Sequence, residues 1–135
     1  MFYNALVISN YFVCVMIERD YLKKQIDLFF QELVAVLTKK TVKETRFKEI
    51  SNLSEKYTQH GIDFFITSSF EEITASYGKD IETLDIIIEL LFQMKDESIE
   101  IVDKLEKIIN YTNQNSLNYS FRRNEILTQI LVIKT

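Results

Sequence analysis

Cysteine and histidine, which most often hold metals or act as nucleophile and base, occur once each in the 135-residue chain. A zinc cage takes four such ligands, and a disulfide within the chain takes two cysteines, so a single chain can form neither. Cys14 lies in an apolar run without a neighbouring cation, which predicts a buried, unreactive thiol. His60 has no partner histidine and no adjacent serine or cysteine signature, so we expect it at a helix end or an interface.

Carboxylates are the second candidate chemistry, because 11 acidic groups and 3 basic ones lie between Glu71 and Glu106. Two sets share helical spacing: Glu82, Asp85 and Glu89, and then Asp96, Glu97, Glu100 and Asp103. A di-iron bundle site needs Glu-x-x-His on two helices, and a calcium loop needs a central glycine; neither pattern is present. We therefore expect a solvated acidic face that a basic partner can contact. An enzyme would instead need two of these acids in a pocket with raised pKa values.

Basic residues form two candidate sites for anions or nucleic acid. The first is a stretch diluted by acidic residues, which we expect to be a solvated helix junction: Lys39, Lys40, Lys43, Arg46 and Lys48. The second is Arg122-Arg123, which lies near Tyr119 and Phe121 and can hold a phosphate or stack on a base. Two arginines at a helix start oppose the helix dipole, and a net charge of −4 disfavours nucleic acid generally.

The elements that must position these residues are helical. Apolar side chains recur at steps of three and four residues almost throughout, while proline is absent and glycine occurs twice. Phosphate loops and folds with many tight turns are therefore unlikely candidates. Residues 62–67 fit either a short helix or an extended connector. The spacing predicts helices over about 17–38, 41–60, 70–77, 80–94, 98–109 and 120–133.

Several residues predict where these helices begin and end. Thr41 and Glu44 form a capping box, and Gly61 is expected to close the second helix in the left-handed conformation. Two overlapping capping boxes, Ser68–Glu71 and Ser69–Glu72, precede the third helix. The fourth helix is expected to begin at Asp80, and the asparagine-rich stretch 110–118 is expected to be a loop. The last helix is predicted to direct inward Phe121, Leu127, Ile130 and Leu131.

These patterns predict an all-α protein, a single bundle of about five to six helices over residues 16–135, preceded by an ordered apolar extension over 1–15. The extension either packs on its own bundle or docks on a second copy, and Met16 is a possible start of the native protein. It lacks the basic start and cleavage site of a signal peptide, and it is too short and polar to span a bilayer. We expect a cytoplasmic protein without a membrane span.

The stretch from Met16 to Leu33, which begins Met-Ile-Glu-Arg-Asp-Tyr-Leu, resembles the opening of an uncharacterised all-helical bacterial family. The likeness continues more weakly through residues 63–65 and 69–73. It then reaches a helix pair that looks like a degenerate tetratricopeptide hairpin, with apolar positions at Phe92, Ile101, Leu105 and Ile108. The resemblance implies a helical fold and no activity. One hairpin would not form a peptide groove, since stacking needs about three repeats.

No motif in the chain points to catalytic, cofactor-binding or metal-binding residues. We therefore predict a non-enzymatic helical interaction or scaffold module, with a homo-oligomer or another protein as its partner. The alternative is a small nucleic-acid-associated regulator, which requires the basic side chains of residues 39–48 or 122–123 to converge on one surface. An enzyme with a carboxylate site is the third possibility.

Overall fold

The computed structural model describes residues 25–135, and this part of the chain is all α-helical, with no strand. Predictions for Cys14, for the extension 1–15 and for the start of the first helix lie outside the described residues. A helical segment covers 25–38 and is followed by six helices: α2 (Lys43–Thr58), α3 (Ile62–Thr67), α4 (Phe70–Tyr77), α5 (Ile81–Phe92), α6 (Ile99–Asn115) and α7 (Phe121–Lys134). The described part thus has seven helical segments, because 62–67 is a short helix.

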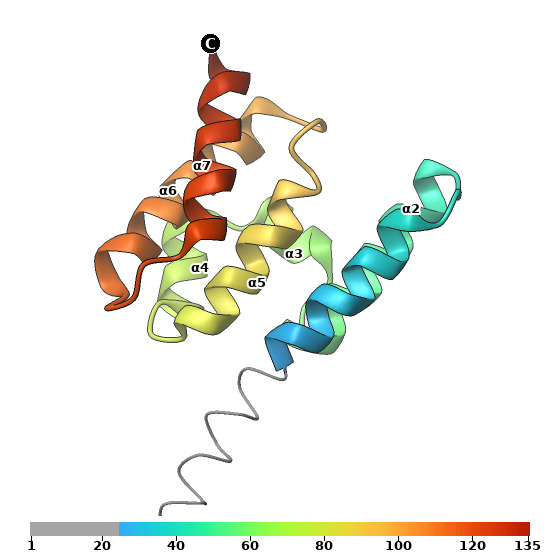
Figure 1. Cartoon of the computed structure of the whole chain (residues 1–135), viewed down its shortest axis with the longest axis horizontal. Helices are drawn as coiled ribbons and strands as arrows, with labels where there is room; N and C mark the ends of the chain where they lie inside the picture. Colours follow the sequence, from blue (N-terminus) through green and yellow to red (C-terminus); the bar gives the residue numbers. More distant parts are fainter. Residues whose placement is uncertain (1–24) are drawn as a thin grey trace, which may run out of the picture.

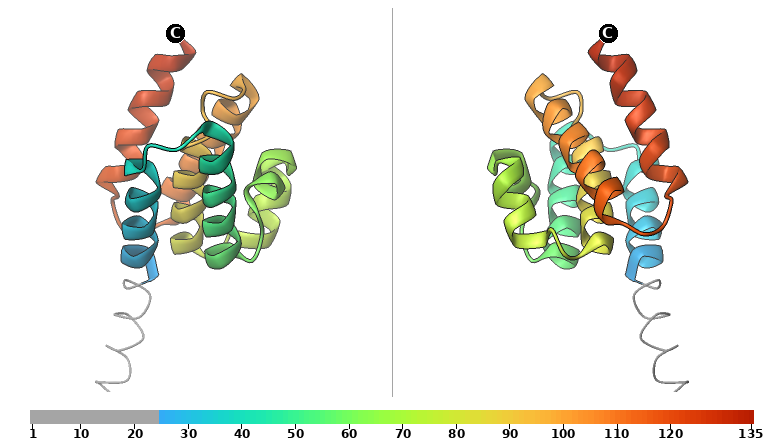
Figure 2. Two further views of the ribbon diagram at one scale, coloured as in Figure 1. Left: turned by 90° about the vertical axis from the view of Figure 1, so that its right-hand side faces the viewer. Right: turned by 90° about the vertical axis from the view of Figure 1, so that its left-hand side faces the viewer.

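Helix α5 occupies the middle of the molecule (Figure 1), between the pair formed by segment 25–38 and α2 and the pair formed by α6 and α7. It packs against α2, α3, α4, α6 and α7. Eight of its twelve residues are buried, Leu84 and the run 86–92, so this helix is enclosed on nearly all sides. Helix α7 lies along the edge of the molecule in both views of Figure 2.

Side-chain caps fix the start of the four later helices. The Ser69 hydroxyl accepts a hydrogen bond from the Glu72 amide, which confirms the serine half of one predicted capping box, while the Glu72 carboxylate accepts from the Ser69 hydroxyl over 3.3 Å. The Asp80 carboxylate accepts from the Thr83 amide, as expected for the residue that begins α5. The hydroxyls of Ser98 and Ser120 cap α6 and α7 in the same way. Each cap satisfies an amide that the first turn of a helix otherwise leaves unbonded.

Both predicted ends of α2 are wrong. The N-cap is Val42, which makes no side-chain bond, so Thr41 lies one position too early for a capping box. The helix ends at Thr58, and its C-cap is Gln59, a non-glycine residue in the left-handed conformation (φ 71°). Gly61 instead precedes α3 at φ −67°. A β-carbon at Gly61 would lie 2.9 Å from the Ser51 hydroxyl oxygen, so close packing explains the glycine.

The predicted loop over 110–118 is also wrong in its first part, because α6 continues to Asn115. Ile109 and Thr112 are buried, and the Tyr111 hydroxyl donates to the Gly78 carbonyl over 2.9 Å. Packing against the earlier helices thus outweighs the weak helix propensity of asparagine.

The predicted inner face of α7 is only partly right. Ile130 is fully buried and Leu127 is half-buried, but Phe121 and Leu131 are exposed. The buried face instead carries Arg123, Ile126 and Ile130. Arg123 is buried on this face because it pairs with Asp85 and Asn113, and this orientation of the helix leaves Phe121 and Leu131 outside.

Candidate functional site

Two carboxylates of α5 point inward, which corrects the expectation that the whole acidic set is solvated. Glu89 lies one turn after Asp85 and is 2% exposed. Both of its oxygens are held by Arg122 of α7, whose Nε and Nη2 donate to them, the second over 3.1 Å. This two-pronged contact is the strongest geometry available to an arginine and a carboxylate. It raises the pKa of Arg122, chiefly through the hydrogen bond with Glu89.

Arg123 forms the second half of this cluster and is 4% exposed. Its Nε lies 2.9 Å from Asp85 Oδ1, within ion-pair range although not aligned as a hydrogen bond. Its Nη1 donates to Asn113 Oδ1 over 2.7 Å, and its Nη2 donates to the Asn118 carbonyl over 3.3 Å. Arg123 therefore ties α7 to α5, to the end of α6 and to the loop between α6 and α7. The carboxylates of Asp85 and Glu89 also offset the unfavourable interaction of the two arginines with the positive end of the α7 dipole.

Burial raises the pKa of Asp85 to about 6, although the positive charge of Arg123 lowers it. A cavity of about 170 Å³ adjoins the cluster, with apolar walls that include Phe30 and Ile126. Two acids beside a cavity, with the pKa of Asp85 raised, meet part of the requirement for a carboxylate enzyme. Each acid, however, already faces an arginine, so the contacts explain the cluster as the ionic attachment of α7 to α5.

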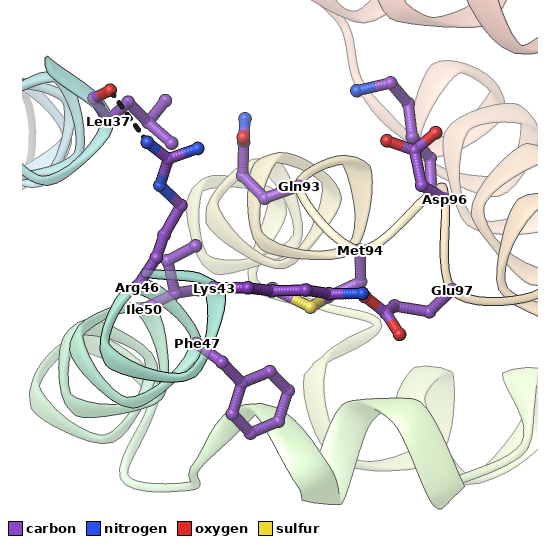
Figure 3. Close-up of a pocket in the computed structure, with 10 residues that line it drawn as sticks. Leu37, Lys43, Arg46, Phe47, Ile50, Gln93, Met94, Asp96 and Glu97 are labelled. Atoms are coloured by element: carbon purple, nitrogen blue, oxygen red, sulfur yellow. Dashed lines mark hydrogen bonds and ion pairs between the residues drawn. The ribbon is translucent and has the colours of Figure 1, made fainter. Parts of the chain in front are cut away.

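A larger pocket, of about 400 Å³, lies between the end of segment 25–38, the start of α2 and the turn 93–97 (Figure 3). Its lining combines apolar and charged side chains. The apolar members are Leu37, Phe47, Ile50 and Met94. The polar and charged members are Lys43, Arg46, Gln93, Lys95, Asp96 and Glu97.

Two residues of the basic stretch predicted from the sequence, Lys43 and Arg46, line this pocket, and the other three lie outside it. Lys39 lies 3.4 Å from Glu49, and Lys43 lies 2.9 Å from Glu97. Arg46 turns toward the end of segment 25–38, where its Nη2 donates to two backbone carbonyls, those of Leu37 (3.5 Å) and Lys39 (3.3 Å). Lys40 and Lys48 are exposed as well, and the pairing of Lys39 and Lys43 with acids reduces the positive charge that this stretch presents.

His60 lies one residue beyond the cap of α2, and its ring stacks on Phe64 with centroids 3.9 Å apart. This position agrees with the predicted helix end. Within residues 25–135, no three histidine, cysteine or acidic side chains gather as a metal ion would require. No helix in that range is long and apolar enough to cross a membrane.

Lys104 has a role that the sequence reasoning missed. Its ammonium group donates to three carbonyls at the end of α3, those of Phe65 (2.6 Å), Ile66 (2.7 Å) and Ser68 (2.7 Å). Partial burial lowers the pKa of this lysine. Its partners lie more than 35 residues earlier in the chain, so no local spacing could have revealed the contact.

The outward side of α7 is unusually apolar. Most of the large apolar side chains that are exposed in residues 25–135 lie between 117 and 133. They are Leu117, Tyr119, Phe121, Leu131, Val132 and Ile133. We call Phe121, Leu131 and Val132, with Thr128 between them, the outer face of α7. Its neighbour Glu125 is already paired with Arg122 at 3.4 Å.

No protein-family model, curated protein or solved structure matches this chain. The likeness of residues 16–33 to a bacterial family therefore stays a prediction, and the function rests on the geometry described above.

Proposed function

We propose that this protein is a non-enzymatic helical interaction module that pairs with a second copy of itself through the outer face of α7. The observation that carries the proposal is that α7 is apolar on two sides. Ile126 and Ile130 fill the core, while Phe121 and Val132 are 75% and 69% exposed on the opposite side. A surface helix normally confines its apolar residues to one side. A second apolar side on an edge helix indicates a second contact.

A second copy fits this face better than a charged partner does. The outer face carries apolar and small polar side chains together with one acid, Glu125, which lies between Phe121 and Thr128 and is paired with Arg122 in the same helix. Low net charge of this kind is compatible with a subunit interface. Two α7 helices that cross about a two-fold axis would bury the same residues from each copy, which is the commonest symmetry of soluble oligomers.

The size of the face sets the expected affinity. A helix of 14 residues is roughly 21 Å long, so two crossed helices bury less than the roughly 800 Å² per partner of a standard interface. We therefore expect a micromolar dimer. The exposed loop residues Leu117 and Tyr119 adjoin the start of α7 and add to this area.

The alternative of a nucleic-acid-associated regulator receives less support. Lys39, Lys43, Arg122 and Arg123 each lie within ion-pair distance of an acidic side chain of the protein, which lowers the counterion release expected on a phosphate backbone and leaves the exposed Lys40 and Lys48 as the main candidates. The degenerate tetratricopeptide hairpin that the resemblance implies would correspond to α5 and α6. A single hairpin of this kind could support the rest of the module, but it would not form a peptide-binding groove.

Sedimentation of the full chain across about 1–200 µM tests the proposal, because a micromolar dimer forms within that range. Val132→Glu, which places two like charges near the two-fold axis, should weaken association by about tenfold or more. The matched control is Val34→Glu, which adds the same charge at an exposed apolar residue of segment 25–38. A monomer at all concentrations, or equal effects of the two variants, would show that α7 is not the interface.

A further inference from the structure

The pocket in Figure 3 contains a polar group that the protein leaves without a partner. Arg46 Nε is buried and donates no hydrogen bond. Its Nη2 makes only two long bonds to backbone carbonyls, at 3.3 and 3.5 Å. Because Nε is enclosed, an acceptor in the pocket would meet the guanidinium at its remaining nitrogen, Nη1, which is directed toward the pocket (Figure 3).

The charges around the pocket leave Arg46 available for an anion. The lining has three cationic side chains and two anionic ones. Glu97 is paired with Lys43, while Asp96 lies across the pocket from Arg46, with Gln93 between them (Figure 3). Lys95 Nζ lies 4.3 Å from the centre of the Phe92 ring, which keeps a further positive charge at the rim.

The apolar part of the lining limits the class of anion. Ile50 and Met94 are almost fully buried beneath the pocket, and Leu37 and Phe47 are half-buried beside it. A multiply charged phosphate would leave the apolar lining unused, and Asp96 would repel it more strongly than it repels a single negative charge. A singly charged ligand with an apolar body uses both parts of the lining.

We propose that this pocket binds a small carboxylate with an apolar body. The carboxylate accepts hydrogen bonds from the Arg46 guanidinium, whose planar fork matches two carboxylate oxygens, and the body lies against Ile50 and Met94. The ligand also adds to the contacts between segment 25–38 and α2, where the bonds of Arg46 lie beside the pairs Lys39–Glu49 and Lys56–Glu32. None of the pocket residues belongs to α7, so this site does not depend on the proposed dimer.

Titration of the full, isotopically labelled chain with isocaproate, followed by ¹H–¹⁵N correlation spectra, tests the site. A ligand of this size should bind with a Kd of about 1 mM, and the shifted amides should cluster in residues 43–50 and 93–97. The neutral isostere isocaproamide should bind about tenfold more weakly, because it offers Arg46 no negative charge.

Arg46→Gln should abolish the preference for the carboxylate. The matched control is Lys48→Gln, which removes an exposed positive charge from the same helix, outside the pocket, and should leave the affinity unchanged.

Lys43→Gln provides a second test that leaves the bonds of Arg46 to segment 25–38 intact. It frees the Glu97 carboxylate and should weaken isocaproate binding about threefold. Equal affinity for acid and amide, shifts elsewhere on the protein, or an unchanged affinity in both pocket variants would each overturn the proposal.

Discussion

Helices α5 and α7 have similar lengths and many isoleucine and leucine residues, but they are used in opposite ways. Helix α5 is buried over eight of its twelve residues and packs against five other helices. Helix α7 packs against α5 and α6, and of its fourteen residues only Arg123, Ile126 and Ile130 are buried. Apolar content alone therefore does not decide which helix becomes the core.

The attachment between the two helices explains the difference. Helix α5 would present a continuous apolar surface if Asp85 and Glu89 were absent, and the two arginines of α7 cover these acids. Ion pairs fix the position of α7, and they place its second apolar side toward solvent. A buried ion pair specifies geometry more clearly than it adds stability.

Removing Arg122 is the strongest way to break this attachment. Arg122→Met leaves the buried Glu89 carboxylate without its partner, so we expect the free energy of unfolding at neutral pH to fall by about 3–5 kcal/mol. Urea unfolding followed by circular dichroism measures the change. Lys56→Met, which breaks the exposed pair with Glu32, is the matched control and should have little effect.

The double variant Arg122→Met/Glu89→Met sharpens the same test. It replaces the pair with apolar side chains and should recover most of the lost stability, because no buried charge is left unpaired. If the double variant is as unstable as Arg122→Met, then the attraction between Arg122 and Glu89, and not the cost of an unpaired charge, holds α7 in place.

The pH dependence of stability reports on the other pair, since burial raises the pKa of Asp85 to about 6. The native state then binds a proton more tightly than the unfolded chain does, so stability should rise as the pH falls from about 7 toward 4. Because Asp85 retains some exposure, we expect the gain to be about 1–2 kcal/mol relative to the Asp85→Asn variant. Thermal or urea unfolding of both proteins across this range measures it. A difference that stays constant with pH would show that Asp85 titrates normally.

The smallest expected effect concerns the start of α7. Ser120→Ala removes the hydroxyl that caps the Arg123 amide and should cost about 1 kcal/mol. Thr41→Ala is the control, because Thr41 resembles a cap in the sequence but caps nothing, and its hydroxyl oxygen has no partner. Unfolding of the two variants in urea should therefore separate them. A larger loss at Thr41 would contradict the observed start of α2.

The sequence predicted the all-α class and the central helix well, because local spacing determines both. Leu84, Ile87 and Leu91 recur at steps of three and four residues, and all three are fully buried. The caps Ser69 and Asp80 act within their own turns, so their roles could also be predicted. Such features depend on a few neighbouring residues and need no knowledge of the rest of the chain.

The sites could not be predicted, since they join residues from distant helices. The sequence suggested that Arg122 and Arg123 hold a phosphate or stack on a base, whereas in the structure they pair with carboxylates of the protein itself. The pocket beside Arg46 combines two helical segments with the turn 93–97, and no single stretch has its pattern. The outer face of α7 was missed because the prediction assigned Phe121 and Leu131 to the core.

The contact of Lys104 with the end of α3 has a consequence for the order of folding. Helix α3 has six residues, too few to persist alone in water. Three carbonyls at its end are bonded by a lysine 36 to 39 residues further along the chain. The chain between the end of α3 and Lys104 must close into a loop before these three hydrogen bonds can form. The entropic cost of closing the loop therefore precedes the stabilisation that the bonds provide. We therefore expect helix α3 to form late in folding, after the later helix that carries Lys104 is in place.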